Sequence, residues 1–283
     1  MRFGIARRTT GRVLICIIAV PLLMVGASWS YAKYEARRAK LLLAEAARIR
    51  IGDSEASIQP LLRRFGGGTC VDLETPEQGT KVDWWGKSEH EHWLRNVPDC
   101  SYFVDVDPWA SPLSVKSGKF VDSKAYVRAK LAMWAIPGRV RSLLGMREWN
   151  TYASISVRGG HVAAVRAGVY VEHRGDWVAH RWELLKEMPY DPYRRPSLDY
   201  SVDGAFLTFP QVGDENGPGS AAIWNYLTNK ASESQIQAAQ SINMSCLTGP
   251  FACKGICDLS HQTIEYLKRH PEAARGYIVP DCQ

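Results

Sequence analysis

TYASISVRGGHVAAVRAGVYVEHRGDWVAHRWELL, residues 151–185, carries the clearest fold signal in the chain. Three runs rich in β-branched and aromatic residues, 151–157, 161–172 and 176–185, are separated by Arg-Gly-Gly and His-Arg-Gly tripeptides. Alternating apolar and polar residues between glycine-bearing turns are typical of antiparallel strands. The stretch therefore predicts a three-stranded antiparallel β-meander.

Further elements are expected on both sides of the meander. The strand candidates are 101–106 (SYFVDV) and 205–209 (AFLTF), and the helix candidates are 232–242 and about 259–270. Ser232 and Gln235 have the spacing of a capping box, which favours a helix start at this point. Strands and helices in this order predict an α+β fold with a helical C-terminus.

The N-terminal stretch Val13–Tyr31 has nineteen residues and no charged side chain. A helix of that length spans about 28 Å, close to the ~30 Å hydrocarbon core of a bilayer. The stretch predicts a single-pass anchor that contacts the lipid bilayer of the bacterial inner membrane. The alternative is a signal peptide cleaved after Ala27 or Ala32, which would release the body as a secreted protein. The apolar run exceeds the roughly 7–15 residues usual in signal peptides, which favours the anchor.

The cysteine content fits a body outside the cytoplasm, where thiols pair. Apart from Cys16, which lies in the apolar stretch, the cysteines are Cys70, Cys100, Cys246, Cys253, Cys257 and Cys282. An even number predicts three disulfides, and locality suggests Cys70 with Cys100, one bridge within 246–257, and one involving Cys282. The alternatives are a zinc site that adds His261 to the clustered cysteines, and a redox-active thiol. The Cys-x-x-x-Cys spacing at 253–257 is not that of a thioredoxin motif.

The charge of the chain argues against a nucleic-acid partner. Of 35 lysines and arginines, four precede the apolar stretch, which leaves 31 against 29 acidic residues. A nearly neutral body lacks the clustered basic face that nucleic acid requires. We therefore expect no nucleic-acid partner.

Two pairs of residues are weak candidates for a metal or acid–base site. His90 and His92 lie two apart and would share one face of a strand, but a catalytic zinc needs three protein ligands. Asp105 and Asp107 have the same spacing, although Val-Asp-Val-Asp-Pro also marks a strand that runs into a turn. A polar strand face is the competing interpretation of the histidines. No cofactor is expected.

The segment between the apolar stretch and the body predicts two helices. One covers 33–51 and ends at Gly52, and the second is expected to start at an N-cap Ser57 with Pro60 in its first turn. Its apolar residues at helical spacing are Ile58, Leu61, Leu62 and Phe65.

Residues 51–54 (Ile-Gly-Asp-Ser) and 62–66 of these helices resemble the opening of bacterial outer-membrane assembly lipoproteins of the SmpA/BamE family. The resemblance covers roughly 20 residues, lacks that family's lipid-modified cysteine and carries over no functional residue. The whole chain also resembles uncharacterised membrane-anchored bacterial proteins.

The expected organisation is a cytoplasmic tail (1–12), a transmembrane anchor (13–31), juxtamembrane helices (32–66) and an extracytoplasmic α+β domain (67–283) with a disulfide-clamped C-terminus. The chain lacks nucleophile-elbow, zincin and dinucleotide motifs. We therefore expect a non-catalytic binding or envelope-assembly module, with an envelope protein as a candidate partner. The alternative is a metal-dependent envelope hydrolase that uses His90 and His92.

Overall fold

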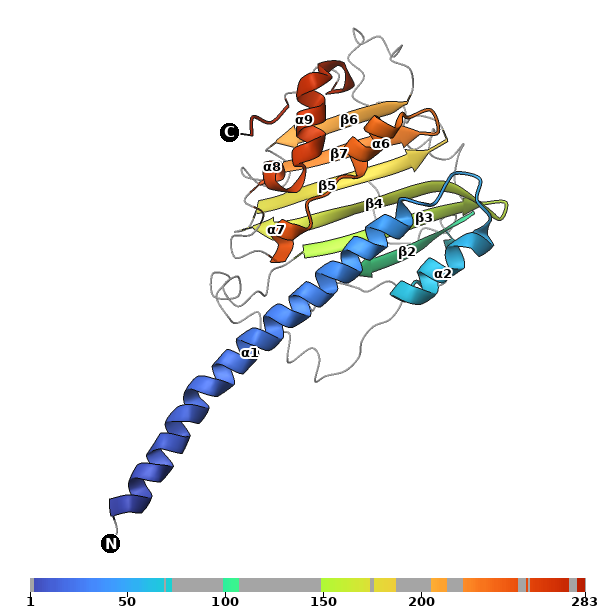
Figure 1. Cartoon of the computed structure of the whole chain (residues 1–283). Helices are drawn as coiled ribbons and strands as arrows, with labels where there is room; N and C mark the ends of the chain where they lie inside the picture. The colour runs from blue at the N-terminus through green and yellow to red at the C-terminus, as the bar shows by residue number, and fades with distance from the viewer. Residues whose placement is uncertain are drawn as a thin grey trace, which may run out of the picture.

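The structure, a computed structural model, is an α+β fold built on one mixed sheet (Figure 1). It describes residues 3–68, 70–72, 99–106, 149–173, 176–186, 205–212, 221–248, 253, 255–274 and 279–282. The strands are β1 (Val71–Asp72), β2 (Cys100–Val106), β3 (Trp149–Arg158), β4 (His161–His173), β5 (Asp176–Leu185), β6 (Phe206–Val212) and β7 (Ala221–Thr228). Their order in the sheet is β1-β2-β3-β4-β5-β7-β6.

The predicted meander forms the middle of this sheet. Strands β3, β4 and β5 pair antiparallel, and the Gly159–Gly160 turn between β3 and β4 has positive φ at both glycines. The strand predicted at 205–209 is the edge strand β6. Strand β7 was not predicted, and it inserts between β5 and β6 and pairs parallel with β5. The sheet is therefore mixed, although most of its pairs are antiparallel.

The helices labelled in Figure 1 lie on one side of the sheet, which we call the covered face. They are α1 (Phe3–Ala46), α2 (Glu55–Phe65), α6 (Glu233–Gln240), α7 (Ser245–Thr248), α8 (Ile256–Leu259) and α9 (His261–Arg269), followed by a 3-10 turn at Pro271–Ala274. Helix α1 contacts β2, β3 and β4, whereas α6 and α8 contact β5 and β7. Burial of the apolar side chains between these two layers stabilises the fold.

Helix α1 joins two different environments. Its C-terminal part packs into the core through buried residues such as Ala39, Leu42 and Ala46. Its N-terminal part projects away from the body in Figure 1 and exposes Leu22 and Leu23. Within the described residues, no helix is both long enough and apolar enough to cross a membrane. The anchor at 13–31 stays a prediction.

The connection between α1 and α2 differs from the predicted one. Helix α1 ends at Ala46, and α2 starts after Ser54, so that Pro60 lies inside the helix. Two hydrogen bonds explain the early start: the Gly52 amide donates to the Val162 carbonyl, and the Glu55 amide donates to the β3–β4 turn. The connection is therefore fixed by the hairpin before the proline is reached. Pro60 is exposed. Proline has no N–H to bond to the carbonyl one helical turn earlier, and at an exposed position water can solvate that carbonyl instead.

Candidate functional site

The side of the sheet away from the helices, which we call the second face, carries a dense group of polar and aromatic side chains. Because side chains alternate along a strand, every second residue of the central strands points to it. Its members are Phe103 and Asp105 on β2, Tyr152 and Ser154 on β3, Arg166, Gly168 and Tyr170 on β4, Arg181 and Glu183 on β5, and Trp224 and Tyr226 on β7. Most of these residues are half-buried. The chemistry that could meet a ligand is therefore concentrated on this side.

One arginine of the second face is neutralised by a carboxylate. Arg166 and Glu183 lie directly opposite each other on β4 and β5. The Arg166 guanidinium donates two hydrogen bonds to Glu183, from Nε at 3.0 Å and from Nη2 at 2.9 Å. Such a bidentate, charge-assisted pair is geometrically specific. Glu183 also raises the pKa of Arg166, so the guanidinium stays charged.

The other central arginine has a different environment. The Arg181 guanidinium carbon lies 4.5 Å from the ring centroid of Trp224, and its Nη2 donates a 3.1 Å hydrogen bond to the Tyr226 hydroxyl. Burial raises the pKa of Tyr226, so this phenol is neutral. Among the described residues, no carboxylate forms an ion pair with Arg181. Within the described residues, Arg181 is therefore a positioned cation that feels the charge of Glu183 but forms no direct ion pair with it.

An aromatic ladder borders these arginines. Phe103 stacks on Tyr152 with centroids 5.9 Å apart, and Tyr152 stacks on Tyr170 at 5.5 Å. Burial and the adjacent Tyr170 raise the pKa of Tyr152, so its ring carries a neutral hydroxyl. The ladder leads across the sheet to the arginines of β4 and β5.

Gly168 separates the ladder from Arg181. It lies opposite Tyr152 on one neighbouring strand and opposite Arg181 on the other. A Cβ at this position would lie 2.6 Å from the His180 carbonyl oxygen, which is closer than real Cβ atoms come to other atoms. The close approach of β4 and β5 requires glycine here. Gly168 adds no side chain of its own to this row, and both Gly168 and Tyr152 are buried.

The covered face contains a second polar group, a buried latch around His180. His180 is fully buried, and its Nε2 lies 2.7 Å from the Ala239 carbonyl oxygen at the end of α6. A carbonyl only accepts, so Nε2 carries the proton and Nδ1 accepts from the Ser260 hydroxyl at 2.8 Å. Asn225 donates to the same Ala239 carbonyl, and Thr208 donates to Asn225. These bonds tie β5, β6 and β7 to the C-terminal helices.

The His180–Ser260 pair has the residue types of a nucleophile and its base, but its environment does not suit catalysis. Both side chains have 0% exposure, so a substrate cannot reach the serine oxygen. Burial lowers the pKa of His180 to about 4, which makes the imidazole a poor proton acceptor at neutral pH. We interpret the pair as part of the structural latch.

The six cysteines of the body form three disulfides, as predicted. They join Cys70 to Cys100, Cys246 to Cys253, and Cys257 to Cys282. The zinc interpretation is wrong because the three clustered cysteines are paired, and His261 is exposed at the start of α9. Three disulfides suggest an oxidising, extracytoplasmic location.

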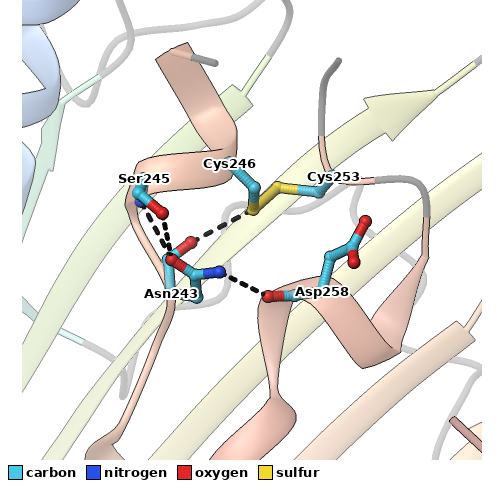
Figure 2. Close-up of a disulfide and its surroundings, with 5 residues drawn as sticks. All are labelled: Asn243, Ser245, Cys246, Cys253 and Asp258. Atoms are coloured by element: carbon cyan, nitrogen blue, oxygen red, sulfur yellow. Dashed lines mark hydrogen bonds between the residues drawn. A yellow bond between two sulfur atoms is a disulfide. The ribbon is translucent and has the colours of Figure 1, made fainter. Parts of the chain in front are cut away.

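Figure 2 shows how the Cys246–Cys253 bridge is supported. The Asn243 side-chain amide donates a 2.9 Å hydrogen bond to the Asp258 carbonyl, and the Asn243 backbone amide donates to Leu259. The Asn243 side-chain oxygen accepts from the Ser245 hydroxyl at 2.5 Å. The bridge and Asn243 together hold α7 against α8, and α7 in turn contacts α1.

The remaining site predictions are placed only in part. His90, His92 and Asp107 lie outside the described residues, and Asp105 lies on the second face. Within the described ranges, no group of three His, Cys, Asp or Glu residues could hold a metal ion. The sequence analysis did not identify the group of residues around Arg181 on the second face. Arginine and aromatic residues at alternate positions of β4, β5 and β7 were the pattern that could have revealed it.

Comparisons with protein-family models, curated proteins and solved structures find no match to this chain. The resemblance to SmpA/BamE-type lipoproteins therefore stays a prediction.

Proposed function

We propose that the chain is a non-catalytic binding or assembly module of the bacterial envelope. Residues 13–31 would tether it to the inner membrane, and the second face would be its binding surface. The observation that carries the proposal is the division of the sheet: helices and a buried latch occupy one face, while half-buried arginine and aromatic side chains occupy the other. Aromatic and arginine side chains are the residues that most often dominate recognition surfaces.

The tether is supported by the continuity of α1. One helix runs from Phe3 to Ala46, so the uncharged stretch 13–31 belongs to the same helix that packs into the core. A helix without a break would hold the body at a defined distance from the bilayer. The three disulfides support a body outside the cytoplasm. Cleavage after Ala27 or Ala32 is the alternative, and it would leave the binding surface unchanged.

Catalysis has weaker support than binding. The described nucleophile–base pair, His180 with Ser260, is fully buried. The hydrolase alternative rests on His90 and His92, which lie outside the described residues, and no metal-binding cluster occurs within them.

Sedimentation with envelope fragments tests the binding surface. The full chain in lipid nanodiscs is mixed with cell-wall and outer-membrane fragments, and the bound fraction is titrated. We expect Arg181→Ala to weaken binding about tenfold or more, which corresponds to about 1.4 kcal/mol. Arg269→Ala is the matched control, because Arg269 is an exposed arginine on α9 of the helical layer. Equal binding by the two variants would refute the second face as the binding surface.

A topology reporter tests the tether. Alkaline phosphatase fused to the C-terminus should be active, because it folds only outside the cytoplasm, and the fusion should sediment with membranes. Activity in the soluble periplasmic fraction would indicate signal-peptide cleavage instead. An inactive fusion would contradict the proposed location of the body.

A further inference from the structure

The part of α1 that follows the uncharged stretch 13–31 has one exposed side. Its exposed side chains are Lys33, Tyr34, Arg37, Lys40 and Leu41. Because they are spaced three, four or seven residues apart, they lie on the same side of the helix, which we call the basic strip. The opposite side of the helix is buried in the core. The basic strip therefore presents three cations and two apolar side chains to the surroundings.

The acidic residues near the basic strip do not neutralise it. Glu35 is 5% exposed, and its two carboxylate oxygens accept hydrogen bonds from Arg38 at 3.0 and 3.1 Å. Glu45 forms an ion pair with Arg64 on α2. Within the part of the chain that the structure describes, the three cations of the basic strip form no ion pair. A surface that complements the basic strip is therefore anionic.

The basic strip begins where the proposed membrane span ends, on the same unbroken helix (Figure 1). At 1.5 Å per residue, the Cα atoms of Lys33 and Lys40 lie about 3 Å and about 14 Å beyond Tyr31 along the helix axis. The polar headgroup layer extends roughly 5–8 Å beyond the hydrocarbon core on each side of a bilayer. Side chains on a helix lean toward its N-terminus, and the long stems of lysine and arginine add reach. All three cations can therefore extend back to the headgroups.

Two further observations favour lipid as the occupant. Tyr34 is 57% exposed, and tyrosine is enriched where a helix leaves the hydrocarbon core. A second copy of the chain paired through this side would bring like charges together. We infer that the basic strip binds the anionic phospholipid headgroups of the leaflet that faces the body. This inference rests on the proposed tether through residues 13–31 and names what α1 contacts beyond it.

Headgroup binding would also orient the body. The basic strip and the sheet lie on opposite sides of α1, because the side that packs into the core is the buried one. A helix that tilts toward its basic strip keeps the sheet on the side away from the bilayer. Headgroup binding would therefore hold the body clear of the membrane.

Lysine acetylation tests the inference residue by residue. The full chain is placed in nanodiscs of phosphatidylcholine alone or of an equal mixture with phosphatidylglycerol, and peptide mass spectrometry gives the acetylation rate at each lysine. We expect Lys33 and Lys40 to react about fivefold or more slowly in the anionic nanodiscs, because an ammonium paired with a phosphate is shielded from the reagent. Lys230 is the matched control, because it is exposed and precedes α6, which lies far from the projecting part of α1 in Figure 1. Its rate should be the same in both nanodiscs.

Two arginine variants of α1 sharpen the test. Arg37→Gln removes the central charge of the basic strip and should return much of the lost reactivity to Lys33 and Lys40 in the anionic nanodiscs. Arg48→Gln is the matched control, because Arg48 is exposed on the same helix but lies about 26 Å beyond Tyr31 along the axis. It should leave both lysines protected. An unchanged near-ultraviolet circular dichroism spectrum shows that each variant is folded.

Two outcomes would overturn the inference. Equal rates at Lys33 and Lys40 in neutral and anionic nanodiscs, as fast as at Lys230, would refute headgroup binding. Slow rates at both lysines in both kinds of nanodisc would identify a protein surface, such as a second copy, as the occupant. In either case, an active alkaline phosphatase fusion that sediments with membranes would leave the proposed tether standing.

Discussion

The two faces of one sheet differ in almost every property, and strand β5 shows both. Val178, His180, Trp182 and Leu184 point to the covered face and are all buried. Of the residues between them, Ala179 and Glu183 are also buried, but Arg181 and Glu183 point to the second face and make cation–π and charged contacts. The comparison teaches that alternation along a strand separates the residues that hold the fold from those that could bind a ligand.

Two tryptophans on neighbouring strands test this separation with the largest expected effect. Trp182 on the covered face is 1% exposed, so Trp182→Ala should lower the free energy of unfolding by about 3–5 kcal/mol through lost burial and a cavity. Trp224 on the second face is half-buried and stacks on Arg181, so Trp224→Ala should lower it by about 1 kcal/mol. Urea unfolding of the full chain in detergent measures both. Equal losses would mean that the faces are not divided in this way.

The latch makes the covered face sensitive to acid. His180 has a pKa of about 4 in the folded chain and about 6.5 when unfolded, so between these values only the unfolded chain binds the proton. The free energy of unfolding therefore keeps its full value above about pH 6.5, and it falls by about 3 kcal/mol as the pH drops to 4. Urea unfolding between pH 7 and pH 4 measures this loss.

Two variants isolate the contribution of His180 from that of the other titrating groups. His180→Asn should have a smaller loss of stability between pH 7 and pH 4 than the unmodified chain. His261→Asn, at an exposed position of α9, should keep the full loss. If His180→Asn and the unmodified chain lose stability in parallel, the imidazole is not held neutral by the latch.

The Cys246–Cys253 bridge should give a smaller effect on the same face. Its loop has a sequence separation of only seven residues, and chain-entropy arguments assign such a loop about 2 kcal/mol. The double variant Cys246→Ala/Cys253→Ala should lower the free energy of unfolding by that amount. Binding of envelope fragments should be unchanged, because the bridge lies in the helical layer (Figure 2). A loss of binding in the folded variant would show that the two faces are coupled.

Local patterns in the sequence predicted much of the fold. The meander follows from alternation and glycine turns, the disulfides from cysteine number and spacing, and the start of α6 from its capping box. In the structure the Ser232 side chain accepts from the Gln235 amide, and the Gln235 side chain accepts from the Ser232 amide. Each of these features depends on residues that are near one another in the chain or on a simple count.

The elements that the sequence did not predict correctly contain polar residues that point into the core. Strand β7 was not predicted because Asn225 points into the core, at a position where the alternating pattern of a half-buried strand has an apolar residue. The helix predicted at about 259–270 is interrupted at Ser260, whose buried hydroxyl bonds to His180. Both residues belong to the latch, and a pattern that assumes an apolar interior cannot detect them. The Arg181–Trp224 contact depends on the register of two strands that are distant in sequence.

The most direct test of the account compares two residues of β5 in two measurements. Arg181→Ala and Leu184→Ala are each assayed for free energy of unfolding and for affinity toward envelope fragments. We expect Arg181→Ala to lose at least tenfold in affinity with a stability change within about 1 kcal/mol. Leu184→Ala should lose about 2–5 kcal/mol of stability and bind normally while folded. If Arg181→Ala binds as the unmodified chain does, or if affinity follows stability in both variants, the division of function between the faces is wrong.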